Sequence, residues 1–330
     1  MKLIILIPAL NETATIARVI GEIPASLPGI TSREVLVIDD GSTDSTREVA
    51  RAAGATVISH GRNRGVGVAF RTGIVEALKR SADILVHLDA DGQFNPADIP
   101  ALLRPIQEGN ADITTCTRFQ RPELLPHMPP IKVWGNRMVT RIVNVATGER
   151  FTDVSCGFRA LTRDAALRLT LFGRFTYTQE MFLDAVQKDL RIVEVPLRVR
   201  GEREVGASRV YANAWSYAAR SAAILFRAVR DSSPLQIFGG VALSQGGCGL
   251  LTGGFVFNHW LQTGQTFPYR SMVTLASVLV LLSAFFATIA LLADMLRRQR
   301  KIVEELVYYA RRDFYDRQSA SNASRVPDAS

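Results

Sequence analysis

The chain has 330 residues, of which 47% are hydrophobic and 21% are charged, a composition that excludes a disordered or fibrous protein. Its 39 Lys and Arg residues exceed its 31 Asp and Glu residues, and the net charge of +8 allows nucleic acid, anionic lipid or phosphorylated ligands as partners. The three scattered cysteines form no CxxC pair, which argues against a disulfide framework or a zinc site and fits a reducing compartment: Cys116, Cys156 and Cys248.

The amino-terminal residues MKLIILIPALNE are apolar only briefly and turn polar at Asn11, so they lack the length and cleavage site of a signal peptide. We expect a buried strand at residues 3–7 instead. From there to about residue 197, short apolar runs alternate with helical periodicity, which is typical of βα units around a mostly parallel sheet. Further strands are expected at residues 34–38, 56–59, 84–88, 113–117 and near 192–199. Between the second and third strands, Thr43 or Ser45 is expected to cap a helix that Gly54 stops.

The composition changes after Tyr211, where apolar residues recur at helical spacing and arginines lie on another face. We expect a first domain at residues 1–211, followed by an amphipathic helix at 212–231. Taken alone, this helix is better explained as a surface helix of a soluble domain. The segment after it favours a helix that lies against anionic lipid headgroups.

Two uncharged stretches follow, from Asp231 to Arg270 and from Arg270 to Asp294. Each exceeds the roughly 20 residues that a helix needs to cross a bilayer. We expect a membrane region at residues 232–296 with spans at about 235–261 and 272–294. The first span holds five glycines between Gly246 and Gly254, so it is either a helix packed by small residues or partly a buried hairpin.

Basic residues bracket the two spans, whereas the loop between them holds only Arg270. By the positive-inside rule, the first domain and both termini are expected in the cytoplasm, with the chain in the plasma membrane. Residues 297–330 are expected to form a basic cytoplasmic tail, disordered at 319–330 because apolar residues are few there. The bracketing residues are Arg227, Arg230, Arg297, Arg298, Arg300 and Lys301.

The most specific polar motif follows the expected strand at 84–88. Asp89 and Asp91 are two carboxylates one residue apart, which at the carboxyl edge of a parallel sheet can hold a hard divalent cation that also binds a diphosphate. Gln93 adds a neutral oxygen. Taken alone, the motif is better explained as a polar turn after a strand. A calcium loop does not fit, because Gly92 comes too early and Pro100 stands where the twelfth-position glutamate belongs.

Two further motifs follow the first two strands. Asp39 and Asp40 end the second strand, where an acidic side chain can accept hydrogen bonds from a nucleobase or ribose, although part of the motif also shapes a turn. PALNE follows the first strand, where a dinucleotide fold would carry GxGxxG. In the nearest stretch, 65–70, Phe70 replaces the third glycine, and the P-loop motif is missing. Hydride transfer and P-loop ATP hydrolysis therefore lose support.

PALNE, DDGSTD and DADGQ together place carboxylates at three neighbouring strand ends. This arrangement resembles the family 2 glycosyltransferases, and with two carboxyl-terminal spans it is similar to the dolichyl-phosphate mannose synthases and polyprenyl-phosphate glycosyltransferases. The resemblance covers roughly residues 2–210. It implies a GT-A nucleotide-diphospho-sugar transferase fold, an α/β architecture with a mixed, mostly parallel sheet, in a catalytic domain at 1–211.

The resemblance also implies a donor site. The motif matching Asp89, Asp91 and Gln93 binds Mg²⁺ or Mn²⁺ with the donor diphosphate in that family. The donor is a nucleotide sugar, with UDP-hexose or UDP-N-acetylhexosamine favoured over GDP-mannose. The residues expected to bind the nucleotide are Pro8, Leu10, Asn11, Glu12, Asp39 and Asp40.

Three later segments resemble the acceptor side of the family. TRFQR matches a segment whose arginine, here Arg118, contacts phosphate, and DVSCGFRAL matches a DxxxGFR segment in which Arg159 could also be a structural ion-pair partner. The third segment resembles R-x-x-G-x-S-K, a phosphate-binding loop, here with Arg203, Ser208 and Arg209. Arg209 replaces lysine, which keeps the charge but changes its geometry.

The implied acceptor is polyprenyl or dolichyl phosphate, whose second pKa near ~6 leaves its oxygen largely anionic, so no strong general base is needed. Metal on Asp89 and Asp91 would stabilise the leaving nucleoside diphosphate. Arg118, Arg203 and Arg209 would neutralise the phosphates. The resemblance implies inversion of the sugar. Glu180, at the position of an acidic acceptor-side residue, could instead cap the following helix.

Two alternatives stay open. A processive polysaccharide synthase would share the donor site, but its QxxRW segment is missing and two spans make a narrow tunnel. A non-catalytic membrane adaptor with a degenerate transferase domain would not need metal-spaced carboxylates. Nucleic acid is not an expected partner, because the basic residues lie beside the spans without interleaved aromatic residues. Membrane lipids are expected partners, and a homo-oligomer is left open.

Overall fold

The computed structural model describes residues 1–126, 128–173, 177–200 and 234–323. The chain divides into an α/β unit, Met1–Leu225 with Leu306–Ser330, and a hairpin unit, Phe226–Glu305. The expected amphipathic helix at 212–231 lies outside the described residues.

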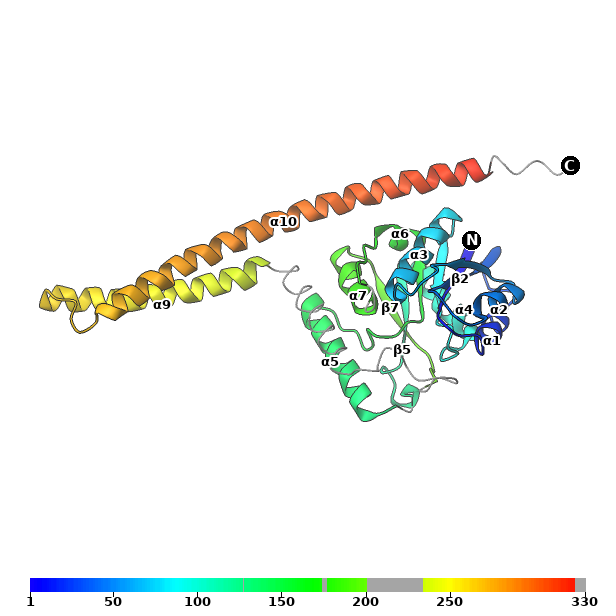
Figure 1. The fold of residues 1–330 in the computed structure, drawn as a ribbon, viewed down its shortest axis with the longest axis horizontal. Coiled ribbons are helices and arrows are strands. Elements are labelled where there is room, and N and C mark those ends of the chain that lie inside the picture. Colours follow the sequence, from blue (N-terminus) through cyan, green and yellow to red (C-terminus); the bar gives the residue numbers. More distant parts are fainter. Residues whose placement is uncertain (127, 174–176, 201–233, 324–330) are drawn as a thin grey trace. The chain divides into compact units, whose positions relative to one another are not determined.

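The described part of the α/β unit holds a seven-stranded sheet in the order β3-β2-β1-β4-β6-β5-β7 (Figure 1). All neighbours pair in parallel except β6, which is antiparallel to both β4 and β5. The expected mixed, mostly parallel sheet is therefore confirmed. The strands are β1 (Lys2–Ala9), β2 (Ser32–Asp39), β3 (Thr56–Ser59), β4 (Ile84–His87), β5 (Ile113–Thr117), β6 (Arg159–Thr162) and β7 (Ile192–Pro196).

Helices cover both faces of the sheet, because the central strands are apolar on both sides. In β1, Leu3, Ile5 and Ile7 pack with one set of helices and Ile4 and Leu6 with the other. The first set is α1 (Ile16–Gly21), α2 (Thr46–Ala52) and α4 (Ile99–Gln107). The second set is α3 (Val66–Lys79), α6 (Arg163–Arg168) and α7 (Tyr177–Gln187). The remaining helices of this unit before residue 200 are η1 (Pro96–Asp98), η2 (Pro122–Leu124) and α5 (Pro130–Thr147).

Local contacts show how α3 packs on the sheet and how α2 begins and ends. Gly73 of α3 touches β1 so closely that a Cβ atom there would lie 2.1 Å from Cδ1 of Leu6. Ser45 occupies the N-cap position of α2 but makes no side-chain cap hydrogen bond, contrary to expectation. Gly54 follows the end of α2 with φ of +89°, a conformation that favours glycine and stops the helix as predicted.

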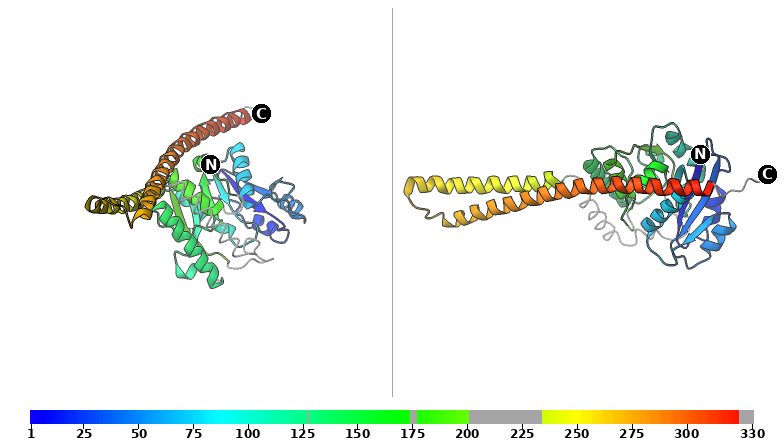
Figure 2. Two further views of the ribbon diagram at one scale, coloured as in Figure 1. Left: turned by 60° about the vertical axis from the view of Figure 1, so that its left-hand side comes forward. Right: turned by 90° about the horizontal axis from the view of Figure 1, so that it is seen from above.

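The hairpin unit contains two helices, α9 (Pro234–Thr263) and the first part of α10 (Arg270–Ala323), which run side by side (Figure 2). A Cβ atom on Gly249 would lie 3.0 Å from Cγ2 of Val280, and Oγ of Ser283 donates to the carbonyl of Ala242 at 2.7 Å. The first expected span is therefore a regular helix that small residues pack against its neighbour, and it contains no buried hairpin.

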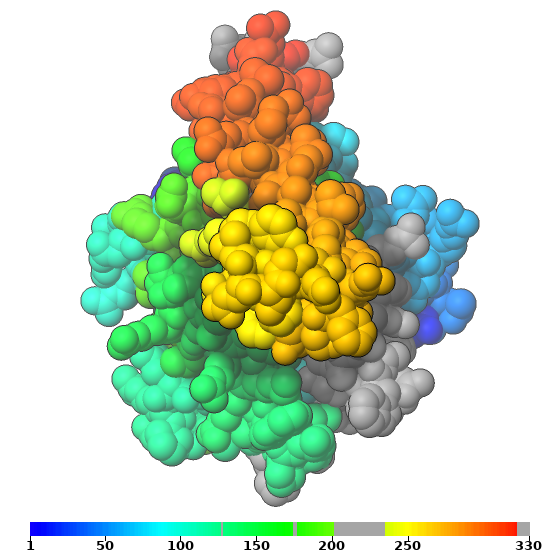
Figure 3. Space-filling model, turned by 90° about the vertical axis from the view of Figure 1, so that its left-hand side faces the viewer, coloured from blue at the N-terminus to red at the C-terminus, as the bar shows by residue number. Residues whose placement is uncertain are grey.

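Both helices are long and apolar enough to cross a membrane by length and composition. Their outer surface carries large apolar side chains, including Leu243, Leu250 and Phe285 (Figure 3, α9 in yellow and the start of α10 in orange). A surface of this kind is unusual for a helix that faces water and fits a lipid environment.

The last part of α10 belongs to the α/β unit. Tyr315 is buried in the core cluster that α3 and α6 share, and the Tyr308 hydroxyl donates to Oδ1 of Asp164 at 2.6 Å. Arg311 donates to the carbonyls of Leu167 and Leu169. The tail at 297–323 is thus helical, including residues 319–323, where we expected disorder. Residues 324–330 lie outside the described part.

Candidate active site

The three polar motifs lie at adjacent strand ends, because β1 pairs with both β2 and β4. Their loops are joined by hydrogen bonds. The backbone N–H of Asn11 donates to Oγ of Ser42 at 2.9 Å, and the N–H of Thr43 donates to Oδ1 of Asn11 at 2.8 Å. Oγ1 of Thr15 donates to the carbonyl of Ala90 at 2.7 Å. The carboxyl edge of the sheet therefore forms one connected polar surface, as predicted from the sequence.

Asp39 is fully buried at this edge. Its carboxylate accepts hydrogen bonds from the N–H of Ser42 at 2.9 Å and from Oγ of Ser59 at 2.6 Å, and Nε of Arg47 lies 3.9 Å away. Burial alone would raise the pKa of Asp39, but these hydrogen bonds and the arginine lower it below the usual value. Asp39 is therefore an anion at neutral pH.

Asp40 holds a loop rather than pointing into an open site. Its two oxygens accept from the N–H groups of Arg64 at 2.9 Å and Gly65 at 2.8 Å, and Nδ1 of His60 lies 2.8 Å from Oδ1. Asp40 thus fixes residues 60–65, which lead into α3. The sequence had grouped it with Asp39 as a nucleotide ligand, and the structure gives it these backbone partners.

Residues 89–93 form a tight turn after β4, called here the 89–93 turn. Asp91 is buried, and its Oδ1 accepts from the N–H of Gln93 at 3.1 Å. The side chain of Asp89 is 33% exposed. A Cβ atom on Gly157 would lie 2.7 Å from Oδ2 of Asp89, so a larger residue in the segment before β6 would require this carboxylate to shift.

His87 lies directly beneath the 89–93 turn. Nδ1 must carry a proton because its partner is the carbonyl of Gly157, 2.6 Å away. Burial lowers the pKa of His87 to about 4, so the ring is neutral and Nε2 accepts from the Tyr177 hydroxyl at 3.1 Å. Nε2 is also 4.0 Å from Oδ1 of Asp89. Burial raises the pKa of Tyr177 as well, which keeps its hydroxyl protonated. No local pattern in the sequence identifies this pair, because His87 stands inside an apolar strand.

Arg118 has a different partner from the expected phosphate. Its Nε lies 2.6 Å from Oδ2 of Asp153 and its Nη2 lies 3.0 Å from Oδ1, which makes a two-point ion pair with a fully buried carboxylate. Burial opposes the charge of Arg118, but Asp153 raises its pKa above the usual value. Nη2 also donates to Oγ of Ser155 at 3.0 Å. Through this ion pair with Asp153, Arg118 links the segment before β6 to the end of β5.

Arg159 is fully buried. Its Nη1 donates to the carbonyl of Thr178 at 3.2 Å and to Sδ of Met181 at 3.5 Å, and its Nη2 donates to the carbonyl of Val154 at 3.3 Å. Its guanidinium also lies 5.0 Å from the centre of the Phe182 ring. These contacts give Arg159 a structural role, through carbonyls, a thioether and a ring rather than through the ion pair that was the alternative considered from the sequence. Glu180 accepts from the N–H groups of Phe172 at 2.8 Å and Gly173 at 2.7 Å, so its carboxylate holds the loop before α7.

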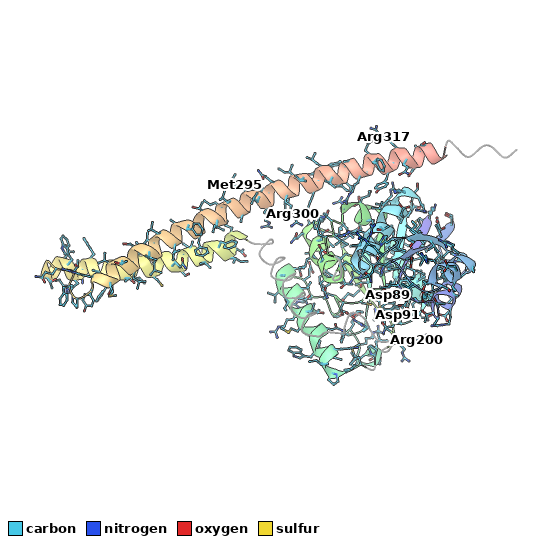
Figure 4. The ribbon with its side chains drawn as sticks, in the orientation of Figure 1. Asp89, Asp91, Arg200, Met295, Arg300 and Arg317 are labelled. Atoms are coloured by element: carbon cyan, nitrogen blue, oxygen red, sulfur yellow. The ribbon has the colours of Figure 1, made fainter. Side chains whose placement is uncertain are left out.

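The predicted loop with Arg203, Ser208 and Arg209 lies outside the described residues. Arg200, just before that loop, was not among the predicted site residues, and its backbone N–H donates to the carbonyl of Gln93 at 3.0 Å. Its Nη1 donates to the carbonyl of Gly92 at 3.3 Å. Figure 4 shows Arg200 beside Asp89 and Asp91. The only sequence signal for Arg200 is its place in a basic segment.

The donor set at the 89–93 turn consists of hard oxygens, which suit Mg²⁺ or Mn²⁺. Among the described residues, no three His, Cys, Asp or Glu side chains gather closely enough to form an all-protein metal site. Magnesium sites commonly use one or two carboxylates and complete their coordination with phosphate and water. Asp89 and Asp91 therefore fit a cation that is bound together with a diphosphate.

Comparisons with known proteins identify the family of the chain. The profile of the family described as "Glycosyl transferase family 2" matches residues 4–170. Glycosyltransferase AglJ of Haloferax volcanii is 30% identical over 311 residues, covering 92% of this chain and 97% of its own. A UDP-N-acetylglucosamine--dolichyl-phosphate N-acetylglucosaminyltransferase of Methanococcus voltae is 30% identical over 59% of this chain and 84% of its own. The undecaprenyl-phosphate mannosyltransferase of Micrococcus luteus is 28% identical over 64% of this chain and 88% of its own.

Among solved structures, glucosyl-3-phosphoglycerate synthase from Mycobacterium tuberculosis, in complex with UDP, has a similar fold. The TM-score is 0.55 at 24% identity, over 69% of this chain and 80% of that chain. A further structure of that enzyme contains Mn²⁺ and UDP-glucose. The sheet order, the carboxylates at three adjacent strand ends and the match over residues 4–170 agree with one another, and the chain accordingly belongs to glycosyl transferase family 2 and is a glycosyltransferase.

Proposed function

We propose that this glycosyltransferase moves a sugar from a nucleotide diphosphate onto polyprenyl or dolichyl phosphate at the cytoplasmic face of the plasma membrane, with inversion at the anomeric carbon. The main support is the combination in one chain of the connected strand-end site with an apolar helical hairpin. The names of the relatives from Methanococcus voltae and Micrococcus luteus include dolichyl phosphate and undecaprenyl phosphate as substrates.

The nucleoside end of the donor would lie over the loops after β1 and β2. Asp39 supplies an anion that its own hydrogen bonds hold in place, and Asn11 joins the two loops. Asp40 acts by fixing the adjoining loop. Pro8, Leu10 and Glu12 complete the proposed nucleotide site. We favour UDP-hexose or UDP-N-acetylhexosamine, with GDP-mannose as the other candidate.

The diphosphate would lie on the 89–93 turn. Asp89, Asp91 and Gln93 would hold Mg²⁺ or Mn²⁺, which supplies Lewis-acid stabilisation of the leaving nucleoside diphosphate when bound. The N–H of Gln93 orients the buried Asp91 carboxylate, and the neutral His87 supports the turn from below without adding a competing cation. The chain thus presents two preorganised anions to a metal–diphosphate complex.

The acceptor phosphate is itself the nucleophile, and its second pKa near ~6 means that it is largely anionic at cytoplasmic pH. The site is consistent with a reaction that needs no general base, since His87 is buried and Glu180 is engaged by two backbone N–H groups. Arg203, Ser208 and Arg209 would bind and neutralise the phosphates. Arg118 would contribute by positioning the segment before β6 through Asp153.

The proposed arrangement in the membrane follows the charge pattern. Both spans, at about 235–261 and 272–294, would cross the plasma membrane, and both termini would be cytoplasmic. The catalytic domain would comprise residues 1–211 together with the last part of α10, which packs on it.

The test is transfer itself. The purified chain in detergent receives polyprenyl phosphate, Mn²⁺ or Mg²⁺, and radiolabelled UDP-glucose, UDP-N-acetylglucosamine or GDP-mannose in turn. We expect metal-dependent label in the organic phase with one donor. Asp91→Asn should abolish it, whereas Asp98→Asn, a matched change outside the site, should not. A folded chain that labels lipid with none of the donors would contradict the proposal and favour the adaptor alternative.

A further inference from the structure

Arg200 lies on the 89–93 turn although its strand is at the far edge of the sheet. β7 pairs with β5, and the N–H of Leu197 still donates to the carbonyl of Thr117 at 3.3 Å. Three residues later, the N–H of Arg200 donates to the carbonyl of Gln93 at 3.0 Å. The chain therefore crosses from the end of β5 to the turn that follows β4.

Packing fixes this crossing. Val199 is buried in the same core cluster as Phe94 and Phe158, so the residue before Arg200 cannot move without opening the core. Arg200 itself is exposed, and its Nη1 donates to the carbonyl of Gly92 at 3.3 Å. An anchored backbone thus holds an accessible guanidinium at the turn with Asp89 and Asp91 (Figure 4).

A guanidinium at this position suits a phosphate ligand better than it suits the carbonyl of Gly92 alone. Its planar fork of N–H donors fits phosphate oxygens in a two-point contact. A diphosphate bound through a cation on Asp89 and Asp91 would carry oxygens that face outward from the metal, where a second cation stabilises them.

We propose that Arg200 binds a phosphate oxygen of the donor's diphosphate and so positions the donor on the 89–93 turn. This assignment rests on the proposed function and adds to it a cation that is separate from the expected Arg203 and Arg209. The backbone N–H of Arg200 also donates to the carbonyl of Gln93, so the same residue would bind the donor and support the conformation of the 89–93 turn.

The test measures the affinity of the full chain in detergent for UDP and for GDP with Mn²⁺ by titration calorimetry, without an acceptor. Arg200→Gln should weaken binding by about tenfold or more, the usual effect of losing a charge-assisted hydrogen bond. Arg200→Met serves as a second neutral variant that keeps the apolar stem. Arg200→Lys keeps the charge and should lose less affinity. Arg198→Gln removes the same charge from the same segment and should leave affinity within about twofold of wild type.

The outcomes separate this proposal from the proposed function. If the wild-type chain binds neither nucleotide, the proposed function fails. If the wild-type chain binds one and the neutral Arg200 variants bind it equally well, only the Arg200 assignment fails. Equal losses of nucleotide affinity in Arg200→Lys and Arg200→Gln would also overturn it. Unchanged melting temperatures are expected, since Val199 supplies the packing.

Discussion

At the scale of single residues, His87 shows how the fold keeps positive charge away from the underside of the 89–93 turn. The imidazole is buried, donates to one carbonyl and accepts from Tyr177, and its pKa of about 4 keeps it neutral. A protonated imidazole 4.0 Å from Asp89 would compete with a divalent cation for that carboxylate. The neutral ring leaves the negative charge of the turn intact.

The lowered pKa of His87 predicts acid sensitivity. An unfolded histidine titrates near ~6.5, so between pH 6.5 and about 4 the unfolded chain binds a proton that the folded chain does not. Stability is fully present above this window and falls as the pH falls through it, by up to about 3 kcal/mol. We expect His87→Gln, which can keep both hydrogen bonds, to lose much less stability between pH 7.5 and 4.5. Melting temperatures at the two pH values check this, and equal losses in both proteins would contradict it.

The pair of Arg118 and Asp153 makes a second prediction. Removing one partner of a buried ion pair leaves a charge without compensation, so Arg118→Gln and Asp153→Asn should each lower stability by roughly 3 kcal/mol. The double variant should lose less than the sum of the two. Melting curves of the four proteins give the coupling. If Arg118→Gln melts like wild type but loses transfer activity, Arg118 contacts substrate directly and its positioning role is wrong.

The sequence could identify residues of the site only where motifs follow strands. Asp39, Asp89 and Asp91 come directly after apolar runs, so the strand pattern alone brings them to one edge. Asp153 lies 35 residues from Arg118, and Tyr177 lies 90 residues from His87. No local sequence pattern links the members of such pairs. Arg200 reaches the 89–93 turn because the chain crosses to it after β7, and the packing of Val199 in the core determines that path.

At the scale of elements, buried parallel strands were the easiest to predict, because their apolar runs are continuous. The expected strands at 56–59 and 113–117 match β3 and β5 in both limits. β6 was overlooked because it has four residues, begins with Arg159 and follows a polar segment. Its antiparallel place between β4 and β5 depends on pairing far along the chain, which hydrophobic periodicity does not report.

The last part of α10 was predicted to be a tail because charged residues dominate its sequence and only one narrow face of the helix is buried. Tyr315 is buried on that face, while Tyr309 on the same helix is 56% exposed. We expect Tyr315→Ala to destabilise the α/β unit by roughly 3 kcal/mol, as for other large buried side chains, and Tyr309→Ala to have little effect. Melting temperature in detergent measures both. Equal melting temperatures for the two variants would show that the helix end does not stabilise this unit.

At the scale of the whole molecule, the charge pattern predicts which segments face the cytoplasm. In a Cys248→Ser background, where Cys116 and Cys156 are buried, a single introduced cysteine reports exposure. We expect Gln265→Cys, in the loop between α9 and α10, to react with a membrane-impermeant maleimide in intact cells. Arg312→Cys should react only after the membrane is opened. The reverse pattern would place the catalytic domain on the outer face and contradict the proposed topology.

The packing of residues 306–323 on α6 also sets an order of events during synthesis. A ribosome releases β1 through β7 first, but Tyr315, Tyr308 and Arg311 leave it only after both apolar helices have been made. Until then, the apolar surface that Tyr315 covers faces solvent or a chaperone. The α/β unit therefore reaches its final fold only in chains whose hairpin is already complete, which in the proposed membrane arrangement ties the maturation of the enzyme to its arrival at the membrane.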